Sequence, residues 1–320
     1  MTDAPKAPQA PKVPLPGRFY HKHIRDAFRA KRPPDLSEGD PRDWIKTVDE
    51  LLGAGRLNLA RFTLNHLRKQ AADLEWPKTM LEIVSMMPEG SVGGPRFVDD
   101  VKSDLQVVPR EGARTVVMGF CGHRHQLNIP LWLFQRWMTK LPVSMVYLRD
   151  FGDTCYLGGV RSCGSFDATA RRLRQVADEV KADRIVCLGN SSGGYGAMRY
   201  GLELGAARVF AFSGAVNMTP EFNTYLNRNE AALRLAETFP DARLDLRELY
   251  LTAPRAPDTE LFYGDKSWDD RIHAEHMAGA PGVVLQPLAG YAGHGALPEL
   301  IQRGRFDEVL TRFVASDSGG

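Results

Sequence analysis

The chain has 320 residues, which is room for one large domain and a small one, and its 43% hydrophobic and 25% charged residues are an ordinary globular balance. A formal net charge of +2 shows no general bias towards nucleic acid, and we predict no nucleic-acid partner. No run approaches the ~18 apolar residues of a membrane span, so we predict no transmembrane segment.

The N-terminal stretch and the cysteines bear on the compartment in which the chain works. The stretch MTDAPKAPQAPKVPLPG lacks the apolar core of a signal peptide. The cysteines form no CxxC pair, so the sequence predicts neither a zinc site nor a disulfide framework. We therefore expect a cytoplasmic protein with no metal site. The four cysteines are Cys121, Cys155, Cys163 and Cys187.

The first 34 residues differ in composition from the rest of the chain. Residues 1–16 contain five prolines and little apolar bulk, and residues 17–34 are rich in Lys and Arg. This composition predicts a disordered, proline-rich and basic tail over residues 1–34. Its positive charge could bind a polyanion or an anionic membrane surface, and a solvated tail without a partner is the alternative.

Residues 35–95 contain three stretches in which apolar residues recur at helical spacing. The pattern predicts a small helical hairpin module, followed by a glycine-rich linker at 88–95. We expect the module to dock on the main domain or on a protein partner. The apolar residues of its first two stretches are Trp44, Ile45, Val48, Leu51, Leu52, Leu57, Ala60, Leu64, Leu67 and Ala71.

From residue 97 onward, short apolar runs alternate with helical patterns. Continuous apolar runs suit strands buried on both faces, and their alternation with helices predicts a mostly parallel, doubly wound α/β sheet. We expect this domain over residues 96–316, with an antiparallel edge strand within 97–108 and an insertion at 214–258. The predicted strands are 115–120, 143–148, 184–189, 208–213, 260–264 and 282–286, and the predicted helices are 128–140, 165–181, 192–204, 268–279 and 297–315.

The stretch GNSSG at 189–193 fits the pattern G-x-S-x-G and lies between a predicted strand and a predicted helix. This is the placement of a nucleophile elbow, in which a tight turn projects a serine above the edge of the sheet. Side chains two positions before and after the serine would collide, which explains Gly189 and Gly193. Only the register centred on Ser191 has glycine at both positions, so Ser191 is the predicted nucleophile and Ser192 supplies a backbone N–H.

With GNSSGGYGA and, further along, an acid and a histidine in the expected order, the chain resembles the α/β-hydrolase superfamily over residues 97–315. The resemblance implies a histidine loop after the last strand. His294, in PLAGYAGHGAL, falls in that loop, between the last predicted strand and the last helix. A serine hydroxyl needs such a base to take its proton, and His294 is the predicted base.

The acid that orients the histidine is less sharply predicted. The strand ELFYG is followed by DKSWDDRIHAEHM, in which three carboxylates compete. The family's commonest spacing would put the acid at Ser267, so this chain departs from it. Asp270, directly before the helical stretch RIHAEHMA, is our first choice, with Asp269 as the main rival and Asp265 third.

The loops after the first two central strands are expected to line the site, because parallel strands place their carboxyl ends at one edge. The resemblance implies a second oxyanion donor in GFCGHRHQ, from the backbone N–H of His123 or of Cys121. The remaining predicted substrate-binding residues are Arg124, Asp150, Tyr156 and Tyr195. A solvated position for Arg124 and a turn-capping role for Asp150 stay open.

The resemblance therefore implies a serine-dependent acyl hydrolase, esterase-like, with a Ser-His-Asp triad. The polar loops favour a small-molecule or glycan acyl substrate, and this chemistry needs no cofactor. Transfer of the acyl group to a glycan or another acceptor is an alternative, and so is a non-catalytic interaction protein with the same fold. A nucleotide-binding loop is disfavoured, because the stretch is neither G-x-x-x-x-G-K-[ST] nor G-x-G-x-x-G.

Overall fold

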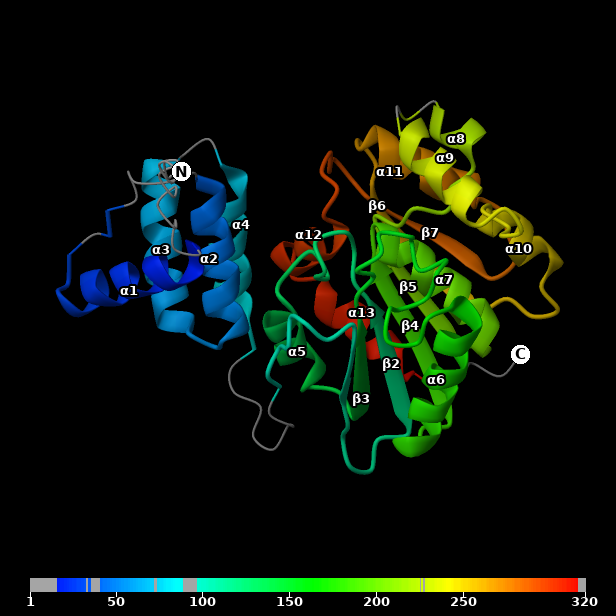
Figure 1. The fold of residues 1–320 in the computed structure, drawn as a ribbon, viewed down its shortest axis with the longest axis horizontal. Helices are drawn as coiled ribbons and strands as arrows, with labels where there is room; N and C mark the ends of the chain where they lie inside the picture. Colours follow the sequence, from blue (N-terminus) through cyan, green and yellow to red (C-terminus); the bar gives the residue numbers. More distant parts are fainter. Residues whose placement is uncertain are drawn as a thin grey trace, which may run out of the picture. The chain divides into compact units, whose positions relative to one another are not determined.

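The computed structural model describes residues 16–32, 34–35, 41–71, 74–88, 97–224, 226 and 228–315. The chain forms two compact units, Met1–Val84 and Ser85–Gly320. In Figure 1 the first unit runs from blue to cyan and the second from cyan through green and yellow to red. No helix in the described part of the chain has the length and hydropathy that crossing a membrane requires.

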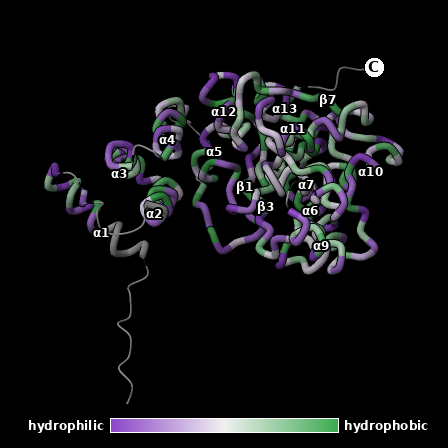
Figure 2. The backbone as a smooth tube through the Cα atoms, turned by 90° about the horizontal axis from the view of Figure 1, so that it is seen from above, coloured by the Kyte–Doolittle hydropathy of each residue, from purple (hydrophilic) through white to green (hydrophobic). Residues whose placement is uncertain are grey.

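The N-terminal unit consists of helices that bury their apolar stripes against each other. Trp44 and Val48 of the second helix and Leu64 of the third are at most 1% exposed. Figure 2 shows hydrophilic and hydrophobic residues alternating along these two helices, as expected for helices with one buried face. The helices are α1 (Pro16–Arg29), α2 (Pro41–Gly53), α3 (Leu57–Gln70) and α4 (Glu75–Met86).

Helix α1 corrects one sequence prediction. Residues 16–29 were expected to belong to a disordered tail, but they form a helix that packs on α2 and α3. Ile24 and Ala27, three residues apart, lie on one face of α1 and are fully buried. Burial of this apolar face stabilises the helix although its other face is charged. The predicted disorder of residues 1–15 lies outside the described residues.

The second unit is built on one seven-stranded sheet with the order β1-β3-β2-β4-β5-β6-β7. Strand β1 pairs antiparallel with β3, and all other neighbours are parallel. The predicted mostly parallel sheet with an antiparallel edge strand is confirmed. The strands are β1 (Leu105–Val108), β2 (Thr115–Phe120), β3 (Val143–Leu148), β4 (Arg184–Asn190), β5 (Arg208–Phe212), β6 (Asp258–Gly264) and β7 (Val283–Leu288).

Helices cover both faces of the sheet, which explains why its central strands are apolar without alternation. On β5, Val209 belongs to the core cluster under helices α6 and α7. The neighbouring Phe210 points the other way, and its ring lies 4.5 Å from that of Phe313 in α13. The helices outside the insertion are α5 (Leu131–Met138), α6 (Phe166–Glu179), α7 (Ser192–Leu204), α11 (Trp268–His276), α12 (Ala296–Gln302) and α13 (Phe306–Val314).

The C-terminal segment differs from the single helix predicted at 297–315, because it forms two helices, α12 and α13. Gly304 lies between them with φ +68°, in the left-handed region that a side chain disfavours. Its N–H bonds the carbonyl of Ile301, so the glycine ends α12 and turns the chain.

The insertion between β5 and β6 carries three short helices and packs against α11. Nε2 of His276, at the end of α11, lies 2.9 Å from both carboxylate oxygens of Asp245 in the insertion. Arg247 donates a hydrogen bond of 2.9 Å to the carbonyl of His276. The insertion is thereby attached to the helix that follows β6. Its helices are α8 (Pro220–Thr224), α9 (Asn229–Thr238) and α10 (Leu246–Thr252).

Candidate active site

Ser191 occupies the turn between β4 and α7. Its backbone lies at φ +52° and ψ −125°, a conformation that L-residues rarely adopt and that costs roughly 1–3 kcal/mol. The N–H of Ser191 donates to the carbonyl of Phe212 on the neighbouring strand, at 3.1 Å. The sharp turn between a buried strand and a buried helix therefore projects this hydroxyl at the carboxyl edge of the sheet.

The glycines around Ser191 are required by the close approach of the backbone. A Cβ on Gly189 would lie 2.0 Å from the carbonyl oxygen of Gly193, and a Cβ on Gly193 would lie 2.1 Å from that of Phe120. Both distances are far inside van der Waals contact. The collision expected from the sequence motif is thus present at both positions.

His294 contacts both Ser191 and a carboxylate. Its Nε2 lies 2.9 Å from Oγ of Ser191, and its Nδ1 lies 2.5 Å from Oδ1 of Asp270. The Asp270 side chain is buried, with 2% of its surface exposed, whereas the His294 side chain is 46% exposed. The structure therefore brings the predicted nucleophile, base and first-choice acid into one hydrogen-bonded line.

The two rival carboxylates point elsewhere. Asp269 precedes Asp270 on α11, so its side chain is rotated by about 100° around the helix, and it forms a 2.6 Å ion pair with Arg228. Oδ1 of Asp265 accepts a hydrogen bond from the N–H of Gly290 at 2.8 Å. The His294 ring therefore pairs with Asp270 and not with either rival.

The loop that carries His294 is held by residues that the sequence analysis missed. Tyr291 lies close enough that a Cβ on Gly293 would be 2.5 Å from its hydroxyl oxygen. The carbonyl of Tyr291 accepts from the N–H of Lys266, in the loop after β6. Ser213 accepts a bond from the N–H of Ala296, at the start of α12. The glycines that flank His294 were the only sequence signal of this packing.

The oxyanion prediction is corrected at one residue. The N–H of Cys121 donates to the carbonyl of Leu148 at 3.0 Å, so it belongs to the strand ladder and cannot serve a substrate. Ser192 is the first residue of α7, where backbone N–H groups have no partner within the helix. His123 lies in the turn closed by the bond from the N–H of His125 to the carbonyl of Gly122. The backbone donors predicted at Ser192 and His123 remain available in this geometry.

Asp150 is also corrected as a substrate contact. Its carboxylate is buried and accepts bonds from the N–H groups of Gly152, Thr154 and Tyr156, at 3.0, 2.7 and 2.9 Å. It organises the loop after β3, in which Asp153 and Tyr156 adopt positive φ. Charge-assisted hydrogen bonds of this kind offset the strain of the loop. The turn-capping alternative left open by the sequence is therefore the one observed.

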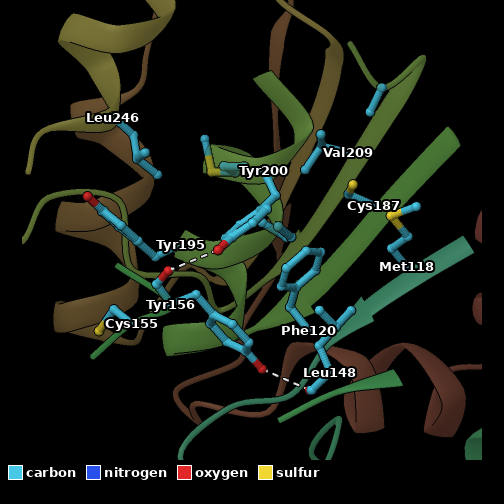
Figure 3. Packing of buried hydrophobic residues seen from close by; sticks show 14 of the residues in the cluster. Met118, Phe120, Leu148, Cys155, Tyr156, Cys187, Tyr195, Tyr200, Val209 and Leu246 are labelled. Carbon is cyan, nitrogen blue, oxygen red and sulfur yellow. Dashed lines mark hydrogen bonds between the residues drawn. The ribbon is translucent and has the colours of Figure 1, made fainter. Parts of the chain in front are cut away.

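The two tyrosines predicted to bind substrate lie in the core. The hydroxyl of Tyr156 donates to the carbonyl oxygens of Cys121 and Leu148, at 2.9 and 2.8 Å. Figure 3 shows its ring beside that of Phe120, and the two ring centroids lie 5.2 Å apart. Tyr195 is fully buried, and its hydroxyl lies 3.3 Å from the carbonyl of Leu244. Burial raises the pKa of both phenols above their usual value. Both residues therefore support the fold and are closed to substrate.

Exposed polar side chains do lie on the loop after β2. Nδ1 of His123 is 2.9 Å from a carboxylate oxygen of Asp153, and these side chains are 77% and 58% exposed. Arg124, between His123 and His125, is exposed as well. Burial lowers the pKa of His125, which lies against Phe151. We call His123, Arg124 and Asp153 the rim of the site; their side chains are polar and exposed. Arg124 stays a predicted substrate contact.

In the described part of the chain, no three His, Cys, Asp or Glu side chains lie close enough together to hold a metal ion. The cysteines described are unpaired thiols, and burial raises the pKa of Cys121 and Cys155 to about 12.

No family model matches the chain, and no curated protein does. Its fold is similar to that of an S-formylglutathione hydrolase from Agrobacterium tumefaciens, with 18% identity, coverage of 65% of this chain and 88% of the other, and a TM-score of 0.44. It is also similar to the esterase Est2 from the Planctomycetes species Thermogutta terrifontis, with 18% identity, coverage of 67% and 90%, and a TM-score of 0.46.

The strand order and the serine turn after β4 give the second unit the α/β-hydrolase fold that the sequence resemblance implied. A hydroxyl, an imidazole and a buried carboxylate stand in line at its carboxyl edge. This arrangement has the parts needed for nucleophilic attack by a serine.

Proposed function

We propose that the protein is a serine-dependent acyl hydrolase that forms an acyl-enzyme on Ser191. The observation that carries the proposal is the pair of contacts of His294, 2.9 Å to Ser191 Oγ and 2.5 Å to Asp270 Oδ1. A buried carboxylate at Nδ1 holds the ring in the tautomer whose Nε2 accepts a proton.

These positions support the following reaction. Nε2 of His294 takes the proton of Ser191 Oγ as the oxygen attacks the acyl carbonyl, and Asp270 stabilises the imidazolium that forms. The oxyanion is bound by the backbone N–H groups of Ser192 and His123. Collapse of the tetrahedral intermediate expels the alcohol, thiol or amine, which takes its proton from His294. Water then attacks the acyl-enzyme by the same route and regenerates Ser191.

The N-terminus of α7 contributes directly to this stabilisation. Its free N–H groups and the positive end of its dipole lie behind the reacting carbonyl. Removal of one oxyanion donor from a serine hydrolase typically costs about 3–4 kcal/mol of transition-state stabilisation. The stretch after Ser191, rich in glycine, lets this helix start without a side chain in the way.

The rim favours a polar acyl substrate. His123, Arg124 and Asp153 offer a base, a cation and an anion at the exposed side of the oxyanion turn. These groups suit the hydroxyl or charged groups of an acylated small molecule or glycan better than an acyl chain alone. Transfer to a non-water acceptor uses the same acyl-enzyme. The cytoplasmic location and a protein partner for the helices α1–α4 stay predictions from the sequence.

A fluorophosphonate probe tests the proposal, because it reacts covalently with an activated serine. We expect the wild type to be labelled on Ser191, Ser191→Ala to be unlabelled, and Ser192→Ala to be labelled, since Ser192 supplies only its backbone. Failure of the wild type to react, or labelling of Ser191→Ala at the wild-type rate, would overturn the proposal. A panel of acyl donors with and without sugar acceptors then distinguishes hydrolysis from transfer.

A further inference from the structure

Two asparagine side chains connect the oxyanion turn to the histidine loop. Oδ1 of Asn190 accepts the N–H of Gly122 at 3.0 Å, and Nδ2 of Asn190 donates to Oδ1 of Asn128. Nδ2 of Asn128 in turn donates to the backbone carbonyl of His294 at 3.2 Å. The bonded line therefore runs from Gly122 through two amides to His294.

The two ends of the line determine the orientation of both amides. Gly122 offers an N–H, which only the oxygen of the Asn190 amide can accept. His294 offers a carbonyl, which only the nitrogen of the Asn128 amide can bond. The remaining nitrogen and oxygen then face each other as donor and acceptor. An aspartate at either position would break this order.

The surrounding backbone is shaped to admit the asparagines. A Cβ on Gly122 would lie 2.7 Å from Nδ2 of Asn190, so only glycine lets the turn approach. Asn190 is 5% exposed and directly precedes Ser191 in the turn. Asn128 has φ +60°, and asparagine is among the few residues that adopt this region readily. Asn128 therefore meets a backbone and a side-chain requirement at once.

We propose that Asn128 and Asn190 are positioning residues that set the distance between the oxyanion donors and the general base. The proposal rests on the acyl-hydrolase function proposed above. The ring of His294 is held by Asp270, and its loop is anchored on either side by the bonds of Tyr291 and Ala296. Asn128 adds a bond to the carbonyl of His294 itself. Asn190 holds the Cys121–Gly122 peptide, directly before the predicted donor His123, by a bond to the N–H of Gly122 that the carbonyl of Gln126 also accepts. Asn128 connects that position to the backbone of His294.

The physical consequence is catalytic, because donors and base must both match the transition state. A misplacement of about 1 Å can cost on the order of 100-fold in rate. Each neutral hydrogen bond by itself adds only about 1 kcal/mol to stability. Loss of the line is therefore expected to lower kcat much more than it lowers the melting temperature or alters KM.

Two variants of Asn128 test the proposal. Asn128→Gly removes the side chain and keeps a residue that tolerates positive φ. Asn128→Asp keeps the shape but faces His294 with an acceptor. We expect each to lower kcat for p-nitrophenyl acetate by about tenfold or more, with little change in KM and the same proportional fall in the rate of fluorophosphonate labelling.

Gln135→Leu is the matched control. It removes a buried amide on α5 that accepts the hydroxyl of Tyr147 on β3 at 2.5 Å. We expect it to lower the melting temperature and to leave kcat unchanged. If it lowers kcat as much as Asn128→Gly does, the effect of Asn128 is general destabilisation, and the proposal is wrong.

A double-mutant cycle tests the coupling. Because the two amides act in one line, Asn128→Gly combined with Asn190→Ala should lose little more kcat than the more damaging single variant. Additive losses would contradict the proposal. Wild-type labelling rates and kcat in both Asn128 variants would overturn it while the acyl-hydrolase function stands. If the wild type is not labelled at all, both the positioning role and the acyl-hydrolase function are wrong.

Discussion

The carboxylate of Asp270 lies 2.5 Å from Nδ1 of His294. An ionised carboxylate only accepts hydrogen bonds, so this contact requires a proton on Nδ1 and leaves the lone pair of Nε2 directed at Ser191. The assignment of a general base thus depends on one side chain of α11. The insertion packs on that helix through His276 and Asp245, which gives residues far from the serine a part in placing the acid.

Asp270→Asn is expected to lower kcat by about 10³–10⁴-fold, because an amide favours the wrong histidine tautomer. The adjacent Asp269→Asn is the matched control, since it removes only a partly exposed ion pair with Arg228. Exposed pairs of this kind contribute at most about 1 kcal/mol to stability, and kcat should stay within about twofold of the wild type. Steady-state kinetics on an activated ester measures both. Equal losses in the two variants would contradict the assignment of the acid.

Tyr195→Phe tests whether the tyrosine after the serine turn contacts substrate. Its hydroxyl is directed at the carbonyl of Leu244, which also accepts the N–H of Met218, so that carbonyl keeps a partner in the variant. We expect a loss of about 1 kcal/mol in the free energy of unfolding and no change in KM. Urea unfolding and ester kinetics measure the two effects. A raised KM with unchanged stability would return Tyr195 to the substrate site.

Gly189→Ala is expected to prevent folding of the serine turn, because its Cβ would lie 2.0 Å from a backbone oxygen that cannot move aside. A loss of more than about 4 kcal/mol is characteristic of such backbone conflicts. Gly119→Ala on neighbouring β2 is the control, since its Cβ would meet only side-chain atoms at 3.4 Å or more. Yield of folded protein and thermal unfolding by circular dichroism should separate the two. Similar melting temperatures would show that the turn can relax.

The sheet and the serine turn could be predicted because their signals are local. Apolar runs, helical spacing and the pattern around Ser191 each lie within a few consecutive residues. The sequence favoured Asp270 for its place before a helical stretch, but Asp270 lies in the first turn of α11. The rotation around α11 is what directs Asp269 to Arg228 and Asp270 to His294, and no local pattern carries it. Burial reversed the roles expected of Asp150 and Tyr156, since both follow a strand end but turn inward. Asn128 had no signal, because its partner Asn190 lies 62 residues away.

His273 makes stability depend on pH. It is buried on α11, and its Nδ1 accepts the N–H of Val216. Burial, and then the charge of Arg228, lower its pKa from 6.5 to about 4. Between pH 6.5 and pH 4 the imidazole is protonated in the unfolded chain but neutral in the folded one. The contribution of His273 to the free energy of unfolding is therefore complete above pH 6.5 and is lost as the pH falls towards 4, by about 3 kcal/mol in all. His273→Gln keeps an acceptor for Val216 but does not titrate. Urea unfolding at pH 7, 6, 5 and 4.5 should therefore show the wild type losing stability relative to this variant as the pH falls, and parallel profiles would contradict a neutral buried imidazole.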